Sequence, residues 1–171
     1  GNPNPDFVYG FNLNFKYKRF TTNLLFNGVY GNDIANGNLI KLNNAEGLQT
    51  NISPNAYNNA WRPDAQTNQY PRIGYEVIPN QSLAVSDRII EDGSFLRLNN
   101  VTLSYDIPVD KIKMLERFNI YVAGQNLVTW TSYSGYNPEV SSFIYNGLIN
   151  GVDWNGAPNA KTFLLGLNIN F

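Results

Sequence analysis

The chain has 171 residues and a net charge of −1, so its charge gives no reason to expect nucleic-acid binding. It contains no cysteine and no histidine, which excludes disulfides, thiolate or imidazole metal sites, cysteine nucleophiles and Ser-His-Asp triads. Charged residues make up 15%, well below the usual value of about 25%, whereas aromatic residues reach 14%. No apolar run has the roughly 18 residues that a transmembrane helix needs. This composition favours a β-protein with long polar loops.

Two strands joined by a tight turn are expected at the start of the chain, over residues 6–17 and 20–31. Apolar and polar side chains alternate in both segments, which predicts strands with one apolar face. Lys18 and Arg19 form the two-residue turn between them. Each strand has the length of about 9–11 residues that a tilted strand needs to cross a bilayer. Residues 1–5 look like the end of a loop that leads into a strand and not like a signal peptide, so the sequence is expected to be a piece of a longer protein.

A long polar loop is expected over residues 32–93, with a helical turn or two between residues 33 and 46. Such a loop is unusual in a compact soluble domain, but the outer loops of a membrane barrel are long. The third strand is expected over residues 94–106. Leu96 and Leu98 there have the opposite parity to Val101 and Leu103, and a bulge near Asn99 and Asn100 would switch the faces of the strand. The sequence alone leaves this strand's register open.

The fourth strand is expected over residues 118–131, a second long loop over 132–160 and a last strand over 161–171. Five apolar residues alternate along the last strand: Phe163, Leu165, Leu167, Ile169 and Phe171. A β-sandwich strand is the ordinary alternative for one such segment. Five segments of this kind predict an all-β fold, an antiparallel transmembrane β-barrel segment with long extracellular loops.

Aromatic residues are expected at both ends of every strand, as in the two aromatic girdles of a membrane barrel. The periplasmic row comprises Tyr17, Phe20, Tyr105, Phe118 and Phe171. The outer row comprises Phe7, Tyr30, Phe95, Trp130 and Phe163. A soluble sandwich has no physical reason to place aromatic residues in this way.

Several segments match sequence motifs that occur together in one family of membrane proteins. Residues 86–105 are similar to the family's DGSFLRLKNITLGY region, and residues 120–127 to its VYVSGQNL strand. Residues 133–139 are similar to YSGYDPE, with Asn137 where the family usually has aspartate. Residues 61–64 and 70–72 resemble the RWTPENP and PR stretches of the large extracellular loop. Together these segments resemble the SusC/RagA-type TonB-dependent transporters, over nearly the whole chain and in the family's order.

The resemblance implies the C-terminal part of a 22-stranded transporter barrel, of which this chain holds the last five strands. The family imports oligosaccharides or peptides across the outer membrane with a SusD-like surface lipoprotein, energised by the TonB complex acting on a plug. The implied partners are therefore the rest of the barrel and its plug, this lipoprotein, the TonB complex and lipid. The last strand also resembles the signal that the barrel-assembly machinery recognises, so it is expected to serve as insertion signal and barrel seam.

Exposed loop aromatics are the candidates for contact with substrate or with the lipoprotein lid, because their flat faces suit sugar rings and protein surfaces. They are Trp61, Tyr70, Tyr133, Tyr136, Tyr145 and Trp154. The alternative is that they pin the loops to each other. The loop carboxylates show no spacing typical of a calcium site or of a paired-carboxylate enzyme. We therefore expect no enzyme, metal or cofactor.

Two other functions are compatible with this sequence. One is a structural or adhesive outer-membrane barrel, and the other is a fragment captured as a substrate of the assembly machinery. A plug domain in the parent sequence would favour transport. Five open strands with an apolar face also predict that the isolated chain aggregates unless detergent, lipid or the rest of its barrel is present.

Overall fold

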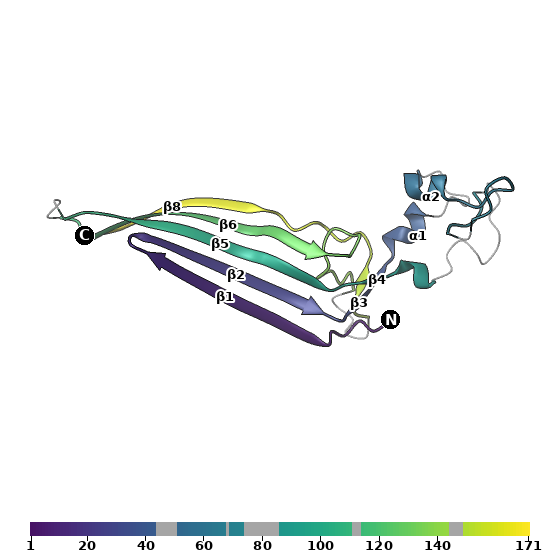
Figure 1. The fold of residues 1–171 in the computed structure, drawn as a ribbon, viewed down its shortest axis with the longest axis horizontal. Helices are drawn as coiled ribbons and strands as arrows, with labels where there is room; N and C mark the ends of the chain where they lie inside the picture. Colours follow the sequence, from purple (N-terminus) through teal and green to yellow (C-terminus); the bar gives the residue numbers. More distant parts are fainter. Residues whose placement is uncertain (44–50, 68, 74–85, 111–113, 144–148) are drawn as a thin grey trace.

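The computed structural model describes residues 1–43, 51–67, 69–73, 86–110, 114–143 and 149–171. Its main feature is one long, five-stranded sheet in the order β1-β2-β5-β6-β8, in which every pair of neighbours is antiparallel (Figure 1). The strands are β1 (Phe7–Tyr17), β2 (Phe20–Tyr30), β5 (Phe95–Ile107), β6 (Arg117–Thr131) and β8 (Thr162–Asn170). The predicted all-β antiparallel fold is therefore confirmed, and all five strands lie where the alternation of the sequence places them.

Strands β1 and β2 form a hairpin whose register is continuous from Phe7 opposite Tyr30 to Tyr17 opposite Phe20. Lys18 closes the turn with φ 54°, in the left-handed region that a two-residue hairpin turn uses. Aromatic residues stack across the hairpin, with ring centroids 5.2 Å apart for Phe7 and Tyr30. Such cross-strand pairs stabilise the register that the turn sets.

Strand β5 contains a bulge, because its pairing with β2 skips Asn99. Leu25 pairs with Asn100, whereas the next residue of β2, Phe26, pairs with Leu98. The extra residue switches the parity of the strand. Four leucine and valine side chains thereby share one face: Leu96, Leu98, Val101 and Leu103. The bulge therefore fixes the register of β5, which the sequence alone left open.

The outer aromatic row is corrected at two positions. The bulge turns Phe95 to the opposite face, where it is only 4% exposed. Phe163 pairs with Gly124, in the middle of β6, because β8 is shorter than the strand beside it. Phe7 and Tyr30 pair with each other, and Trp130 pairs with Leu96, so these three aromatics lie toward the expected end of the sheet.

Short elements gather at the end of the sheet opposite the β1–β2 turn, in segments expected to be loops (Figure 1). A second sheet has the order β4-β3-β7, with β3 and β7 parallel. Its strands are β3 (Asp33–Asn36), β4 (Ile90–Asp92) and β7 (Val152–Asp153). The helices are α1 (Asn38–Leu42), α2 (Pro54–Asn58) and the 3-10 helix η1 (Asp87–Ile89). We call this region the loop end.

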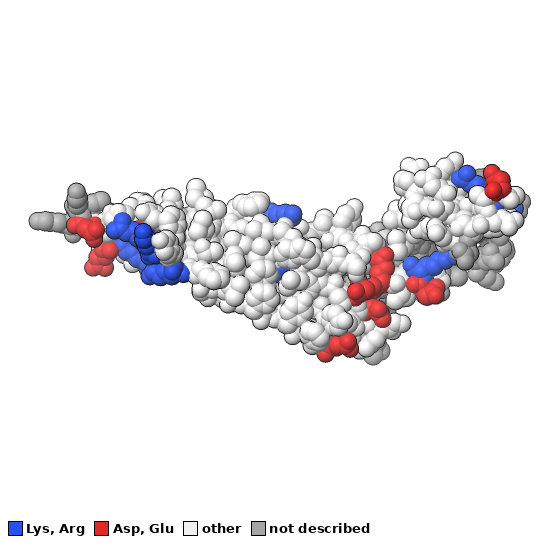
Figure 2. Space-filling view, in the orientation of Figure 1, with Lys and Arg blue, Asp and Glu red and all other residues white. Residues whose placement is uncertain are grey.

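The buried apolar side chains lie at the loop end and not along the sheet. Among the described residues they are Ile34, Ala56, Ala60, Ile89, Phe95 and Tyr133. The middle of the sheet is mostly free of charge, whereas charged side chains gather toward the two ends of the molecule (Figure 2). Within the part of the chain that the structure describes, no helix is long and apolar enough to cross a membrane.

Candidate membrane face and loop-end site

One face of the long sheet is apolar along its whole length, and we call it the apolar face. Neighbouring strands contribute to it in register: Leu13 pairs with Leu24, Leu24 with Val101, and Val122 with Leu165. Its large exposed side chains are Phe7, Phe11, Leu13, Phe15, Tyr17, Phe20, Tyr30, Leu103, Val122, Val128, Trp130, Phe163, Leu165, Leu167 and Ile169. Water does not tolerate so large a continuous apolar surface, so this face requires an apolar environment.

The predicted periplasmic row lies at one end of this face. Tyr17 pairs with Phe20, and Phe20 pairs with Tyr105, with ring centroids 4.6 Å apart for the second pair. Phe118 pairs with Ile169 one step closer to the end of the sheet, and Phe171 directly follows β8. The register therefore brings together row residues from four strands, and Phe171 directly follows the fifth.

The opposite face of the sheet is rich in amide side chains, and we call it the inward face. Asn23 donates to Asn12 Oδ1 at 2.9 Å and to Asn14 Oδ1 at 2.6 Å, across the β1–β2 hairpin. Near the far end, the Asp106 carboxylate accepts hydrogen bonds from Arg117 and from Asn119, at 3.0 and 2.9 Å. These groups are uncharged or paired, and suit contact with water or with a polar protein surface.

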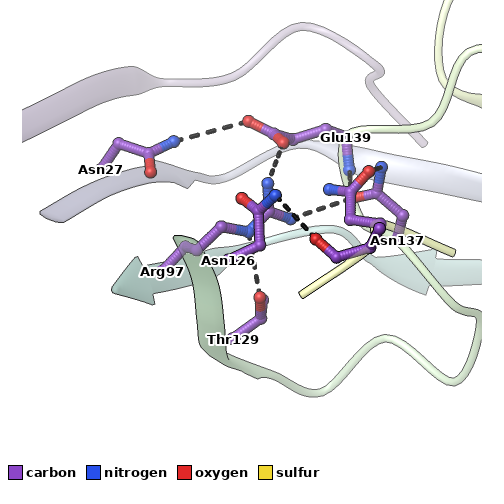
Figure 3. Close-up of polar contacts among 8 residues, drawn as sticks. Asn27, Arg97, Asn126, Thr129, Asn137 and Glu139 are labelled. Atoms are coloured by element: carbon purple, nitrogen blue, oxygen red, sulfur yellow. Dashed lines mark hydrogen bonds and ion pairs between the residues drawn. The ribbon is translucent and has the colours of Figure 1, made fainter. Parts of the chain in front are cut away.

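Arg97 ties the second long loop to the inward face (Figure 3). It projects from β5, is 4% exposed, and donates to Thr129 Oγ1 at 3.0 Å and to Asn137 Oδ1 at 2.9 Å. Its third contact is an ion pair with Glu139, whose carboxylate also accepts from Asn27 at 3.5 Å. A buried charge is tolerated only when it is paired and hydrogen-bonded, and this loop supplies the pairing.

A second polar cluster lies at the loop end, beneath the surface. Tyr133 is 5% exposed and donates its hydroxyl to Asp153 Oδ2 at 2.6 Å, while Gly156 N–H donates to Asp153 Oδ1 at 2.9 Å. Burial, followed by the hydrogen bond to the Asp153 carboxylate, raises the pKa of Tyr133 far above its usual range. Ser134 donates to both oxygens of Glu91, at 2.7 and 2.9 Å. These contacts join residues 133–134 to β7 and β4, whereas the Arg97 cluster joins residues 137–139 to β5.

An open groove of about 380 Å³ lies on the outer surface of the loop end. Its lining comprises Gly37, Asn38, Lys41, Leu42, Tyr136, Trp154, Asn155 and Gly156. Tyr136 is 80% exposed and Trp154 is 42% exposed. The Lys41 ammonium lies 5.6 Å from the centre of the Trp154 ring system. We call this feature the aromatic groove.

The six predicted loop aromatics thus occupy different places. Tyr136 and Trp154 meet in the aromatic groove. Trp61 and Tyr70 are half-buried neighbours in another segment, where Trp61 N–H donates to Tyr70 O at 3.1 Å. Tyr133 is not exposed at all but buried, as in the alternative that these residues pin the loops together. Tyr145 lies outside the described residues.

Sequence reasoning missed Arg97 and Lys41 as site residues. The available signal for Arg97 was its position as a lone cation in a strand otherwise built of apolar and uncharged polar residues before Asp106. Lys41 gave no signal, because only the fold brings it to Trp154. Among the residues that the structure describes, no group of three or more carboxylates is arranged to hold a metal ion.

The antiparallel sheet has one exposed apolar face and one amide-rich face, and its connections are short at one end and long at the other. These are the features of a wall of a transmembrane β-barrel. Comparison with known proteins supports this class. The chain is 33% identical over 177 residues to "TonB-dependent receptor P3" of Formosa agariphila, covering 100% of this chain and 17% of that protein. It is 31% identical over 178 residues to "TonB-dependent receptor SusC" of Bacteroides thetaiotaomicron, covering 99% and 15%. No family model matches the chain.

Solved structures agree with these relatives. The RagAB peptide importer in its "closed-closed" state matches with a TM-score of 0.83 and 27% identity, over 98% of this chain and 17% of that chain. The "open-open" state matches with a TM-score of 0.82. The chain therefore belongs to the SusC/RagA family of TonB-dependent receptors, which lie in the outer membrane. It spans about a sixth of the length of the curated relatives it matches. These relatives are receptors and importers, not enzymes.

Proposed function

We propose that this chain forms part of the wall of an outer-membrane transporter that imports oligosaccharides or peptides and is energised by the TonB complex. The observation that carries the proposal is the apolar face, whose side chains are exposed over five strands in register. The likeness to SusC and to the RagAB peptide importer supports the transport class. A SusD-like surface lipoprotein is the proposed partner on the outer side, over the loop end.

The two edges of the sheet support a larger barrel. Within the described residues, β1 pairs only with β2, and β8 pairs only with β6. In a membrane, unpaired backbone groups at such edges cost several kcal/mol each, so further strands must pair with them. We assign β8, with Phe163, Leu165, Leu167, Ile169 and Phe171, to the seam of that barrel. Its role as an insertion signal for the assembly machinery stays a prediction.

The inward face then points to the lumen, where its amides contact water or the plug. The short β1–β2 turn lies on the periplasmic side with the row of Tyr17, Phe20, Tyr105, Phe118 and Phe171. The loop end lies on the outer side, since outer loops are long and periplasmic turns short. This orientation places the aromatic groove toward the cell exterior and the lid.

An accessibility experiment tests the orientation. Short epitope tags are inserted into the full-length receptor, one after Tyr136 and one between Lys18 and Arg19. We expect antibody on intact cells to bind the first tag only, and to bind both after the outer membrane is permeabilised. Binding of the second tag on intact cells would overturn the orientation.

An uptake experiment tests the transport class. Deletion of the receptor gene should abolish uptake of at least one labelled oligosaccharide or peptide pool, and loss of TonB should have the same effect. If uptake is unchanged in both strains while attachment of the cells to surfaces is lost, the adhesive barrel would replace the transporter.

A further inference from the structure

The aromatic groove has the composition of a site for a charged sugar. We propose that it binds an acidic saccharide, with a pyranose ring against Trp154 and Tyr136 and its carboxylate or sulfate at Lys41. The inference rests on the proposed transport function, for which it names the substrate class at one site. Flat aromatic faces with polar groups at their edges suit the apolar faces and hydroxyl rims of sugar rings.

The groove is held in place by contacts with the elements around it. Trp154 N–H donates to Ser142 Oγ at 2.7 Å, and Asn155 N–H donates to Asn38 Oδ1 at 2.8 Å. A side chain at Gly37 would overlap the Trp154 ring, so the glycine allows the ring to lie against the backbone before α1. A site fixed by backbone contacts of this kind loses little conformational entropy when it binds a ligand.

The charge of the groove favours an anion. Among the described residues that line it, Lys41 is the one that carries a charge. The nearest acidic residue in sequence to Trp154 is Asp153, which is 2% exposed and accepts hydrogen bonds from Tyr133 and Gly156. That carboxylate therefore points into the cluster beneath and not into the groove. An exposed ammonium beside an aromatic ring adds attraction for an anionic substituent, and this attraction weakens with salt.

The backbone around the groove argues against an extended peptide as its occupant. A bound peptide strand needs a free strand edge for its main-chain hydrogen bonds. Strand β7, the strand next to the groove, pairs with β3 on one side. On its other side Ser142 N–H donates to Val152 O at 2.8 Å, and Ser142 Oγ accepts from Trp154 N–H. Both sides of β7 are occupied, whereas side-chain amides and aromatic rings remain available.

The test uses the purified full-length receptor with its lipoprotein partner in detergent. Binding of three probes is measured by calorimetry: a galacturonic acid trisaccharide, a galactose trisaccharide and an alanine tripeptide. We expect the acidic trisaccharide to bind more tightly than the neutral one, and the tripeptide not to compete. Trp154→Ala should weaken binding of the acidic trisaccharide by about tenfold, the size typical of a lost aromatic contact. Lys41→Gln should weaken it about threefold at low salt and leave the galactose trisaccharide unaffected.

Matched variants separate the groove from general effects on the loops. Tyr57→Ala removes an exposed aromatic residue that lies under Arg62 in a different segment, and Lys18→Gln removes a cation at the opposite end of the sheet. Both should bind the acidic trisaccharide like the parent. Equal binding by the parent, Trp154→Ala and Lys41→Gln would overturn the inference, as would preference for the tripeptide. If uptake still depends on the receptor in that case, the proposed function stands and only the groove assignment fails.

Discussion

The apolar face and the loop end differ in where their apolar side chains lie: exposed on the first and buried in the second. On the apolar face, large side chains such as Phe15 and Leu165 stay exposed, because no other part of the described chain covers them. At the loop end, Ile34, Tyr133 and even the carboxylate of Asp153 are buried. The sheet is therefore stabilised by its hydrogen-bonded register and by an apolar surrounding, and the loop end by packing and paired polar groups. The same chain therefore combines a sheet suited to a membrane with a loop region suited to water.

The largest expected loss of stability comes from a charged substitution on the apolar face of β8, compared with the same substitution on its inward face. Leu165 is 72% exposed on the apolar face, and its neighbour Leu164 is 51% exposed on the inward face. Leu165→Arg should destabilise the full-length receptor by about 2–4 kcal/mol, because it places a cation in lipid. Leu164→Arg is the matched control and should cost much less, since the inward face is polar. Urea unfolding of both variants in lipid bilayers measures the difference, and equal losses would contradict the membrane assignment.

The next effect concerns the two ion pairs of the inward face. Arg97→Met leaves Glu139 without its cation and removes one of the two donors to Asn137 Oδ1, which should cost about 1–3 kcal/mol and release the loop. Hydrogen exchange of residues 133–139 in the full-length receptor should rise, while exchange in β2 stays unchanged. Arg117→Met is the control: that side chain is 61% exposed, and exposed ion pairs contribute little to stability. Unchanged loop exchange in Arg97→Met would refute the anchoring role.

A smaller loss is expected from Tyr133→Phe, which removes the donor to Asp153 Oδ2 but leaves the ring in place. The unpaired carboxylate oxygen should cost about 1 kcal/mol or somewhat more, seen as faster proteolysis of the second long loop. Tyr136→Phe, in the exposed position three residues later, should behave like the parent. If both variants are cleaved at the parent's rate, the buried hydroxyl does not hold the loop.

The same hydroxyl gives an alkaline pH dependence. The pKa of Tyr133 is raised in the folded state, so its stabilising effect is complete below the ordinary tyrosine pKa of about 10. The effect is lost as the pH rises above that value, because the unfolded loop releases the proton first. Loop proteolysis should therefore accelerate above about pH 10 in the parent, and less steeply in Tyr133→Phe.

The smallest effect on the stability of the loop end is expected at acid pH, where stability falls as the pH decreases. Hydrogen bonds from the hydroxyl and the backbone N–H of Ser94 lower the pKa of Asp92. This stabilisation is present above the ordinary aspartate pKa near 4 and declines as the pH falls below it. Asp92→Asn should flatten the acid side of the loop-proteolysis profile. An unchanged acid slope would show that Asp92 does not contribute.

The alternation of apolar and polar residues predicted the sheet well, because side chains two residues apart in a strand lie on the same face. The hairpin of β1 and β2 agrees with the expected segments within a residue, and the turn at Lys18 and Arg19 is confirmed. The prediction was wrong at Phe95, whose direction depends on the bulge at Asn99. A bulge is decided by pairing with strands on both sides, and β2 lies some 70 residues earlier in the chain.

Alternating side chains were enough to predict the fold class, the five strands and the apolar face, because alternation is a property of neighbouring residues. Three contacts became visible only in the folded chain: Arg97 pairs with Glu139, the buried Tyr133 donates to Asp153, and Lys41 lies beside Trp154. These partners come from distant segments, and short strands such as β3 and β7 bring them together without any periodic signal. The membrane wall can be predicted from neighbouring residues alone, whereas the loop-end site forms only when the long loops fold against one another.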